Sequence, residues 1–165
     1  GMESWGYRSD EDFYSDFHLQ ASIDRYLARG ANYLLNVGPD ASGQIPGEAA
    51  SILKRLGSWY ASVNESFEDV EPAPELISSK DLLVTRRGEN TLYLHFYKSP
   101  AGDGFKLKPL DTLPRRALLL NNKREVECIV NLSPGDHQEQ KKYLRLRKLP
   151  VNEMQGKVMV VKLEF

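Results

Sequence analysis

Acidic residues beside aromatic residues are the first candidates for chemistry in this chain. Asp10, Glu11 and Asp12 follow one another close to Trp5 and Tyr7. Carboxyl groups beside aromatic rings occur at sugar sites, because one carboxyl can donate a proton while another stays ionised. The alternative is a solvated acidic loop before a helix, whose positive amino-terminal end favours anions. The solvated loop is the commoner arrangement in proteins, and the spacing alone does not select the sugar site.

Other classes of reactive site find no support in the spacing. His18, His95 and His137 are scattered without an HxxxH pattern, so we predict no metal site and no cofactor. The chain has no GxSxG elbow, and residues 38–43 lack the lysine of a phosphate-binding loop. The lone cysteine, Cys128, lies in a mostly apolar stretch, and we expect a small core residue there rather than a nucleophile.

The composition is that of a folded globular protein. The chain has 165 residues, of which 41% are hydrophobic and 27% charged, so collagen-like, disordered and membrane-spanning classes are excluded. Lys and Arg number 22 and Asp and Glu 23, which leaves a formal net charge of -1. We therefore predict neither a nucleic-acid partner nor a membrane partner. No signal-peptide pattern or transmembrane run is present, and the sequence does not indicate the cellular compartment.

The first half of the sequence predicts a helix, a buried strand and a second helix. Helical spacing favours a helix over Asp16–Arg29, capped by Ser15 and ended by Gly30. The short apolar run Tyr33–Val37 is typical of a parallel strand that is covered on both faces. Pro46 opens the second helix. The apolar stripe of that helix consists of Ile52, Leu53, Leu56, Trp59, Tyr60 and Val63.

The second half changes to a period of two residues. We place a linker at Pro72-Ala73-Pro74 and an antiparallel β-sandwich after it. The predicted strands are Leu82–Thr85, Thr91–Tyr97, Ala117–Leu120, Val126–Val130, Tyr143–Arg147 and Val158–Leu163. Turn clusters separate them, one at residues 133–136, and the charge run at residues 138–142 is interpreted as a solvated turn. The predicted fold class is α+β.

One predicted strand carries a possible sugar-binding face. Tyr93, His95 and Tyr97 lie on the same side of it, because alternate residues of a strand share a face. If this face is exposed, its rings could stack on sugars in a non-catalytic binding module. If it is buried, it belongs to the core. The solvent exposure of these side chains separates the two possibilities.

Residues 30–46 carry a more specific signal. They read GANYLLNVGPDASGQIP, which strongly resembles the signature G-x-N-x-L-L-N-x-G-P-x-x-x-G-x-I-P. That signature lies near the end of the catalytic barrel in α-L-fucosidases, a family of retaining glycoside hydrolases. Trp5-Gly6-Tyr7 resembles the aromatic-Gly-Tyr motif that precedes it in the family. Leu56-Gly57 and Trp59 match one end of the L-x-x-G-x-W helix pattern that follows, and residues 143–165 are similar to the closing strands of the family.

The resemblance implies two structural parts. Residues 1–71 are expected to be the carboxyl-terminal fragment of a (β/α)8 barrel, and residues 72–165 the β-sandwich appended to it. The chain departs from the family after its second helix, where Val63–Glu68 keeps only the glutamate of a family N-G-E-A-I-Y-G-T stretch. Asn64 is expected to supply the left-handed conformation of the family glycine.

The resemblance also implies which functional residues the chain lacks. In the family, the carboxylate nucleophile and the acid come from barrel segments upstream of everything present here. We therefore assign no catalytic role to the acidic cluster or to Asp40. Trp5 maps onto the position where the family places an aromatic ring against the apolar face and methyl group of fucose. The alternative is that Trp5 packs on the first helix. Asn36 and Asp40 follow the predicted strand on the functional face of such barrels, or Asn36 simply ties down the loop.

Three functions follow from these expectations. The first is the carboxyl-terminal portion of an α-L-fucosidase, inactive alone, with a fucose-containing glycan as the ligand of the whole enzyme. The second is a non-catalytic carbohydrate-binding or structural β-sandwich module. The third is a piece that completes a barrel with a separate partner chain. Because the predicted strand has no parallel neighbour in this chain, we also expect a homodimer that shields Leu34, Leu35 and Trp59.

Overall fold

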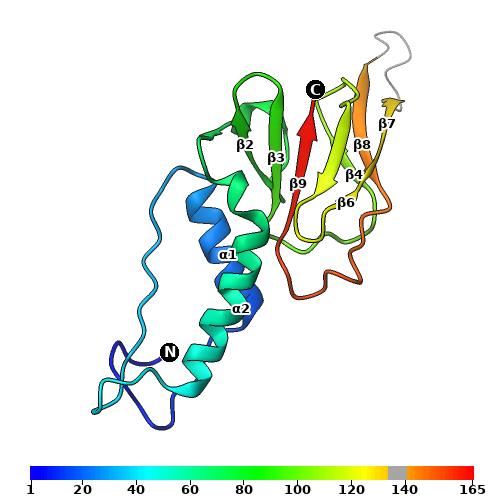
Figure 1. Ribbon diagram of the computed structural model, residues 1–165. Helices are drawn as coiled ribbons and strands as arrows, with labels where there is room; N and C mark the ends of the chain where they lie inside the picture. Colours follow the sequence, from blue (N-terminus) through cyan, green and yellow to red (C-terminus); the bar gives the residue numbers. More distant parts are fainter. Residues whose placement is uncertain (134–140) are drawn as a thin grey trace.

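Two helices lie side by side in the first half of the chain (Figure 1). The first, α1 (Asp16–Leu27), begins where the Ser15 hydroxyl accepts a hydrogen bond from the His18 backbone amide at 3.2 Å. It ends two residues before the predicted position, ahead of Gly30, whose φ of 75° is left-handed as expected. The second helix, α2 (Gly47–Val63), follows Pro46. The computed structural model describes residues 1–133 and 141–165.

The segment between the helices is not the strand that the sequence predicts. Residues 33–37 run as an open trace beside the helices, and no other segment pairs with them in the described parts of the chain (Figure 1). Burial alternates as in a strand, because Tyr33, Leu35 and Val37 are half-buried whereas Leu34 is 93% exposed. A strand needs a hydrogen-bonded neighbour. The predicted strand at residues 33–37 is wrong, because an apolar pattern in the sequence does not provide a hydrogen-bonded neighbour.

The second half forms two antiparallel sheets that pack face to face, which confirms the predicted sandwich and the α+β class. The six-stranded sheet has the order β1-β2-β3-β9-β5-β6. Its strands are β1 (Glu71–Pro72), β2 (Leu83–Arg87), β3 (Thr91–Phe96), β9 (Met159–Glu164), β5 (Arg116–Leu119) and β6 (Arg124–Glu125). The three-stranded sheet is β4 (Phe105–Leu107), β8 (Lys142–Arg147) and β7 (Glu127–Leu132) in that order. All six predicted strands are present, and the short β1, β4 and β6 were not predicted.

The predicted linker is part of the six-stranded sheet. Glu71 and Pro72 pair with Arg86 and Thr85 of β2, and fully buried Ala73 donates its backbone N–H to the carbonyl of Val84 at 2.9 Å. Proline is tolerated here because β1 is an edge strand, where no partner requires its missing N–H. Two short 3-10 turns, Asn64–Ser66 and Pro74–Leu76, flank this strand.

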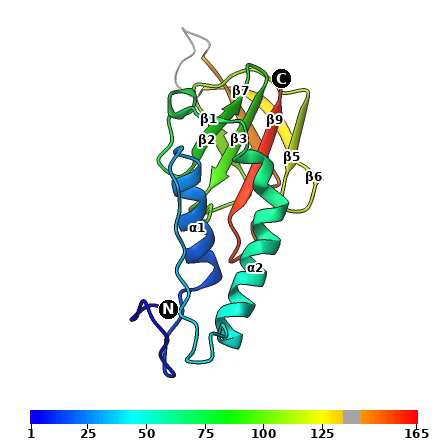
Figure 2. The same cartoon turned by 60° about the vertical axis from the view of Figure 1, so that its left-hand side comes forward.

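The six-stranded sheet is covered on both faces, so the molecule has three layers (Figure 2). Leu92, Leu94 and Phe96 of β3 face the three-stranded sheet. Tyr93 and His95 face the helices, and both are fully buried. The exposed sugar-stacking face considered above is therefore wrong for these two residues, because helices cover them. The third residue, Tyr97, follows β3, is half-buried and donates its hydroxyl to the Lys80 carbonyl at 2.8 Å.

Two further expectations concern a helix end and a loop of the sandwich. Asn64 has a φ of −56°, which is right-handed, and the left-handed residue of this region is Asp69 with a φ of 51°. The predicted turn at 133–136 and the charge run at 138–142 fall mostly on residues 134–140, outside the described residues. Within the described residues, neither helix combines the length and apolarity of a membrane span.

Candidate functional site

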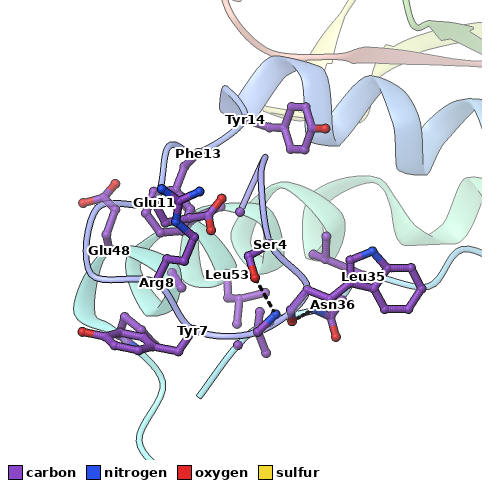
Figure 3. A pocket seen from close by; sticks show the side chains of 18 of the residues that line it. Ser4, Tyr7, Arg8, Glu11, Phe13, Tyr14, Leu35, Asn36, Glu48 and Leu53 are labelled. Carbon is purple, nitrogen blue, oxygen red and sulfur yellow. Dashed lines mark hydrogen bonds between the residues drawn. The ribbon is translucent and has the colours of Figure 1, made fainter. Parts of the chain in front are cut away.

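A hollow of about 560 Å³ lies at the amino-terminal ends of the two helices. Its walls come from the amino-terminal segment, from residues 33–38 and from the first turns of α1 and α2 (Figure 3). Trp5, Tyr7, Tyr14 and Asn36 are among the lining side chains, with Leu53 of α2 on the apolar side. The hollow therefore sits where the segment 33–37 ends, which is the position expected for the functional face of a barrel.

The helices are held together beneath this hollow. Leu19, Ile52 and Leu56 form a small buried cluster between them, and Leu35 packs against it. Asp16 in the first turn of α1 accepts two hydrogen bonds from the guanidinium of Arg55 in α2, at 2.6 Å and 3.1 Å. The helix starts are thus fixed relative to each other by apolar contact and by a paired charge.

The loop that carries Trp5 is attached to residues 36–38. The side-chain amide of Asn36 donates a hydrogen bond to the backbone carbonyl of Trp5 at 2.6 Å, and the hydroxyl of Ser4 accepts one from the Gly6 amide at 3.1 Å (Figure 3). The Trp5 side chain is 91% exposed. It does not pack on α1, so that interpretation is wrong. Asn36 thus ties down the loop of Trp5, whereas the loop that follows Asn36 itself is held by Asp40.

The acidic cluster is engaged by local donors. Arg8 pairs with Glu3 and Asp10, and its hydrogen bond lowers the pKa of the Asp10 carboxyl. The Glu3 backbone amide donates to Glu11 at 2.7 Å and lowers the pKa of that carboxyl as well. A general acid requires a raised pKa. Both shifts run in the opposite direction, which is the behaviour of carboxylates that stay ionised.

Asp40 organises the loop that follows residues 33–38. Its Oδ1 accepts hydrogen bonds from the Ser42 amide at 2.8 Å, the Ser42 hydroxyl at 2.6 Å and the Gln44 amide at 3.0 Å. The bond from the Ser42 hydroxyl is the main cause of a lowered pKa at Asp40. Gly43 turns the chain here with a φ of 84°. Asp40 thus acts on its own loop, as an Asx turn does.

Two features of the hollow were not predicted. Arg8 had no assigned role, although it pairs with Asp10 of the acidic cluster and with Glu3. Tyr14 and His18 stack with ring centroids 4.7 Å apart, and their i, i+4 spacing at the start of a helix was the available signal.

The described residues provide no metal site or reactive thiol. No group of three or more potential metal ligands comes together among them. Burial, with a smaller contribution from Glu127, raises the pKa of Cys128 to about 11. That shift suits a half-buried structural cysteine rather than a nucleophile.

Comparison with known proteins finds one enzyme family. Residues 1–65, which include the hollow and both helices, match the family described as alpha-L-fucosidase. This part of the chain resembles the α-L-fucosidases. An α-L-fucosidase of Dictyostelium discoideum is 35% identical over 72 residues, which span 42% of this chain and 16% of that protein. A tissue α-L-fucosidase of Bos taurus is 23% identical over 135 residues, or 80% of this chain and 29% of that protein.

Solved fucosidases share the fold of the whole chain. The α-L-fucosidase isoenzyme 1 of Paenibacillus thiaminolyticus matches with a TM-score of 0.73 and 26% identity, over 97% of this chain and 37% of that one. The α-L-fucosidase of Vibrio sp. strain EJY3 matches with a TM-score of 0.74 and 26% identity, over 98% of this chain and 28% of that one. The family resemblance predicted from residues 30–46 is confirmed, and the chain spans well under half the length of these relatives.

Proposed function

We propose that this chain is the carboxyl-terminal part of an α-L-fucosidase that hydrolyses α-L-fucosides, and that it is inactive alone. Residues 33–37 carry the proposal. They belong to the stretch that matches the fucosidase family, yet they have no strand neighbour within the described residues. An extended apolar segment with exposed Leu34 suits a barrel whose other strands come from upstream. The missing strands are also where the nucleophile and the acid of the family are expected.

The charges around the hollow support the absence of an acid in this part of the enzyme. Asp10, Glu11 and Asp40 all have lowered pKa values because they accept hydrogen bonds from neighbouring donors. A retaining glycosidase needs one carboxyl that holds its proton near neutral pH and a second carboxylate about 5–5.5 Å away. Each of these three carboxylates is instead tied to its own loop.

Trp5 is the residue proposed to contact the sugar. Its indole is exposed at the rim of the hollow, so a ligand can reach its face. A flat apolar ring favours a sugar face that carries C–H groups and the methyl of a deoxy sugar over a fully hydroxylated face. In this proposal Trp5 orients fucose, and the upstream barrel supplies the polar contacts and the reacting carboxyls.

The upstream strands can come from the same polypeptide or from a separate partner chain, and a second copy of this chain is a further candidate to cover Leu34. Trp59, which was also assigned to a homodimer interface, is shielded by this chain's own sandwich through its hydrogen bond to the Val158 carbonyl at 3.0 Å. The dimer therefore remains a prediction that rests on Leu34 and its segment.

Hydrolysis of p-nitrophenyl α-L-fucoside tests the proposal. The purified chain should release no p-nitrophenol above the blank. The chain fused behind the upstream barrel of the Paenibacillus thiaminolyticus relative should gain turnover, and Trp5→Ala in the fusion should lower kcat/KM. Turnover by the chain alone that scales with protein through repurification would overturn the proposal. Tyr26→Ala, at an exposed aromatic residue that does not line the hollow, serves as the aromatic control for Trp5→Ala.

A further inference from the structure

The Trp5 loop and residues 36–38 touch at two independent points. The first is the 2.6 Å hydrogen bond from the Asn36 side chain to the Trp5 carbonyl. The second is a close backbone approach at Gly38. A Cβ atom on Gly38 would lie 2.5 Å from the carbonyl carbon of Gly6 and 2.6 Å from the backbone nitrogen of Tyr7. No side chain fits in that space without displacing the loop.

These contacts matter because the indole of Trp5 fixes nothing by itself. At 91% exposure the ring has little packing to hold the loop in place. The hydrogen bond from the Gly6 amide to the Ser4 hydroxyl lies within the loop, so it shapes the loop without attaching it to the rest of the molecule. Hydrogen bonds from Met2 to Asp12 and from Glu3 to Glu11 close the amino-terminal segment on itself. The contacts that attach the loop at Trp5 to residues 36–38 are those of Asn36 and Gly38.

We propose that Asn36 and Gly38 are positioning residues for Trp5. The Asn36 amide holds the Trp5 carbonyl, and the bare Cα of Gly38 lets the backbone of residues 6–7 lie directly against it. Together they fix the indole at the rim of the hollow before a ligand arrives, which reduces the entropy lost when a ligand binds. The importance of this for sugar recognition rests on the proposed function, whereas the positioning itself does not.

Nuclear magnetic resonance on the whole chain tests the positioning without any sugar. The chain has two tryptophans, so its spectrum has two indole N–H signals, and Trp5→Phe assigns them. In the unmodified chain, the backbone order parameters of Trp5 and Gly6 should be near 0.85, the range of rigid backbone. In Asn36→Ala they should fall below about 0.6. Asn36→Asp should do the same, because a carboxylate oxygen would face the carbonyl oxygen of Trp5.

Gly38→Ala is the independent second arm. It leaves the Asn36 side chain intact, yet it should shift the signals of residues 5–7 because the new methyl displaces their backbone. Gly57→Ala is the matched control, since no atom lies within 4 Å of a Cβ built there. Asn32→Ala is the control for Asn36, because Asn32 is exposed and has no side-chain hydrogen bond in the described structure. Both controls should leave Trp5 unchanged.

The buried Trp59 reports on the fold in the same spectra. The proposal is supported if the Asn36 and Gly38 variants mobilise residues 5–7 while the Trp59 signal stays in place. It is overturned if Trp5 keeps its order in Asn36→Ala, or if the unmodified loop already has order parameters below about 0.6. The order parameters of Trp5 and Gly6 in the unmodified chain test the proposal even if a variant fails to fold. Because no sugar is used, failure of the fucoside experiment above would leave this result standing, and the reverse also holds.

Discussion

The two helices meet the six-stranded sheet through an interface in which buried polar side chains are hydrogen-bonded, although Oδ2 of Asp24 has no partner among the described residues, whereas the hollow at their amino-terminal ends is open. At the interface, Trp59 donates to the Val158 carbonyl at 3.0 Å, and Gln20 accepts from the Val158 amide at 3.0 Å. At the hollow, Trp5 and Leu34 are more than nine-tenths exposed, at 91% and 93%. The first region is closed by contacts within this chain. The second leaves two large apolar side chains exposed to solvent.

A network of buried hydrogen bonds links four elements at the helix–sheet interface. The Thr85 hydroxyl donates to the Ser66 carbonyl at 3.1 Å, so it accepts from His95 Nε2, which lies 3.0 Å away. His95 Nδ1 lies 2.8 Å from Oδ1 of Asp24 in α1, and all four residues are buried. These hydrogen bonds join α1 and the turn at residues 64–66 to strands β2 and β3 of the sandwich. Loss of this network should weaken the contact between α1 and the six-stranded sheet.

Breaking this hydrogen-bond network should cause the largest loss in the free energy of unfolding. Asp24→Ala leaves His95 buried without its partner, and a broken buried pair typically costs about 3–5 kcal/mol. Urea unfolding at pH 7 measures the loss. The matched control is Asp16→Ala in the same helix, whose partner Arg55 is half exposed, so its cost should stay below about 1 kcal/mol. Equal losses of stability in the two variants would show that the buried Asp24–His95 pair contributes no more than the exposed Asp16–Arg55 pair.

A smaller effect is expected when Trp59 keeps its bulk but loses its N–H. Trp59→Phe removes the hydrogen bond to the Val158 carbonyl, which still accepts one from Asn121 at 2.8 Å. The carbonyl is not left unpaired, so the cost should be about 1–2 kcal/mol. Urea unfolding again measures it. A loss as large as that of Asp24→Ala would indicate that packing of the indole, rather than its hydrogen bond, dominates at this position.

The antiparallel half of the fold was predictable from the sequence, and the reasons show why other parts were not. The period of two residues at 158–163 located β9, because alternate residues of that strand enter different clusters on its two faces. The same reasoning failed at Tyr33–Val37, where the apolar pattern resembles a strand but no segment of the described residues pairs with it. It also failed at Pro72, since proline suggests a linker unless the strand that contains it lies at an edge.

The site was predictable to a lesser extent. The motif at residues 30–46 located the family, and the short polar side chain of Asn36 after the apolar run suggested a loop tie. The pairing of Arg8 with Asp10 and Glu3 was not predicted, because it depends on how an irregular loop folds back on itself. Loops without periodicity give no such signal in a single sequence.

At the hollow, substitutions should affect stability little. Leu34→Ala removes a side chain that is 93% exposed, so the free energy of unfolding should change by less than about 0.5 kcal/mol. If Leu34 covers another copy of the chain instead, the same variant should lower self-association in light scattering at micromolar concentration. A stability loss above about 2 kcal/mol in a monomer would contradict the exposed placement.

The smallest expected effect is electrostatic and local. Hydrogen bonding lowers the pKa of Asp40 in the folded chain, so the loop gains stability above the pKa of the unfolded aspartate and loses it as pH falls through the folded pKa. The amide signals of Ser42 and Gln44 should therefore titrate with a midpoint below about 3.9, the ordinary pKa of aspartate. Asp40→Asn should abolish this titration. A midpoint above the ordinary value would contradict the hydrogen bonds.

Amide hydrogen exchange tests most directly the central contrast between the hydrogen-bonded helix–sheet interface and the unpaired segment at residues 33–37. In the monomeric chain at low micromolar concentration, residues 33–37 should exchange within about tenfold of the unfolded rate, because nothing in the described chain pairs with their backbone. The amides of β3 and β9 should exchange many orders of magnitude more slowly. Protection of residues 33–37 equal to that of β3 in the monomer would contradict the account.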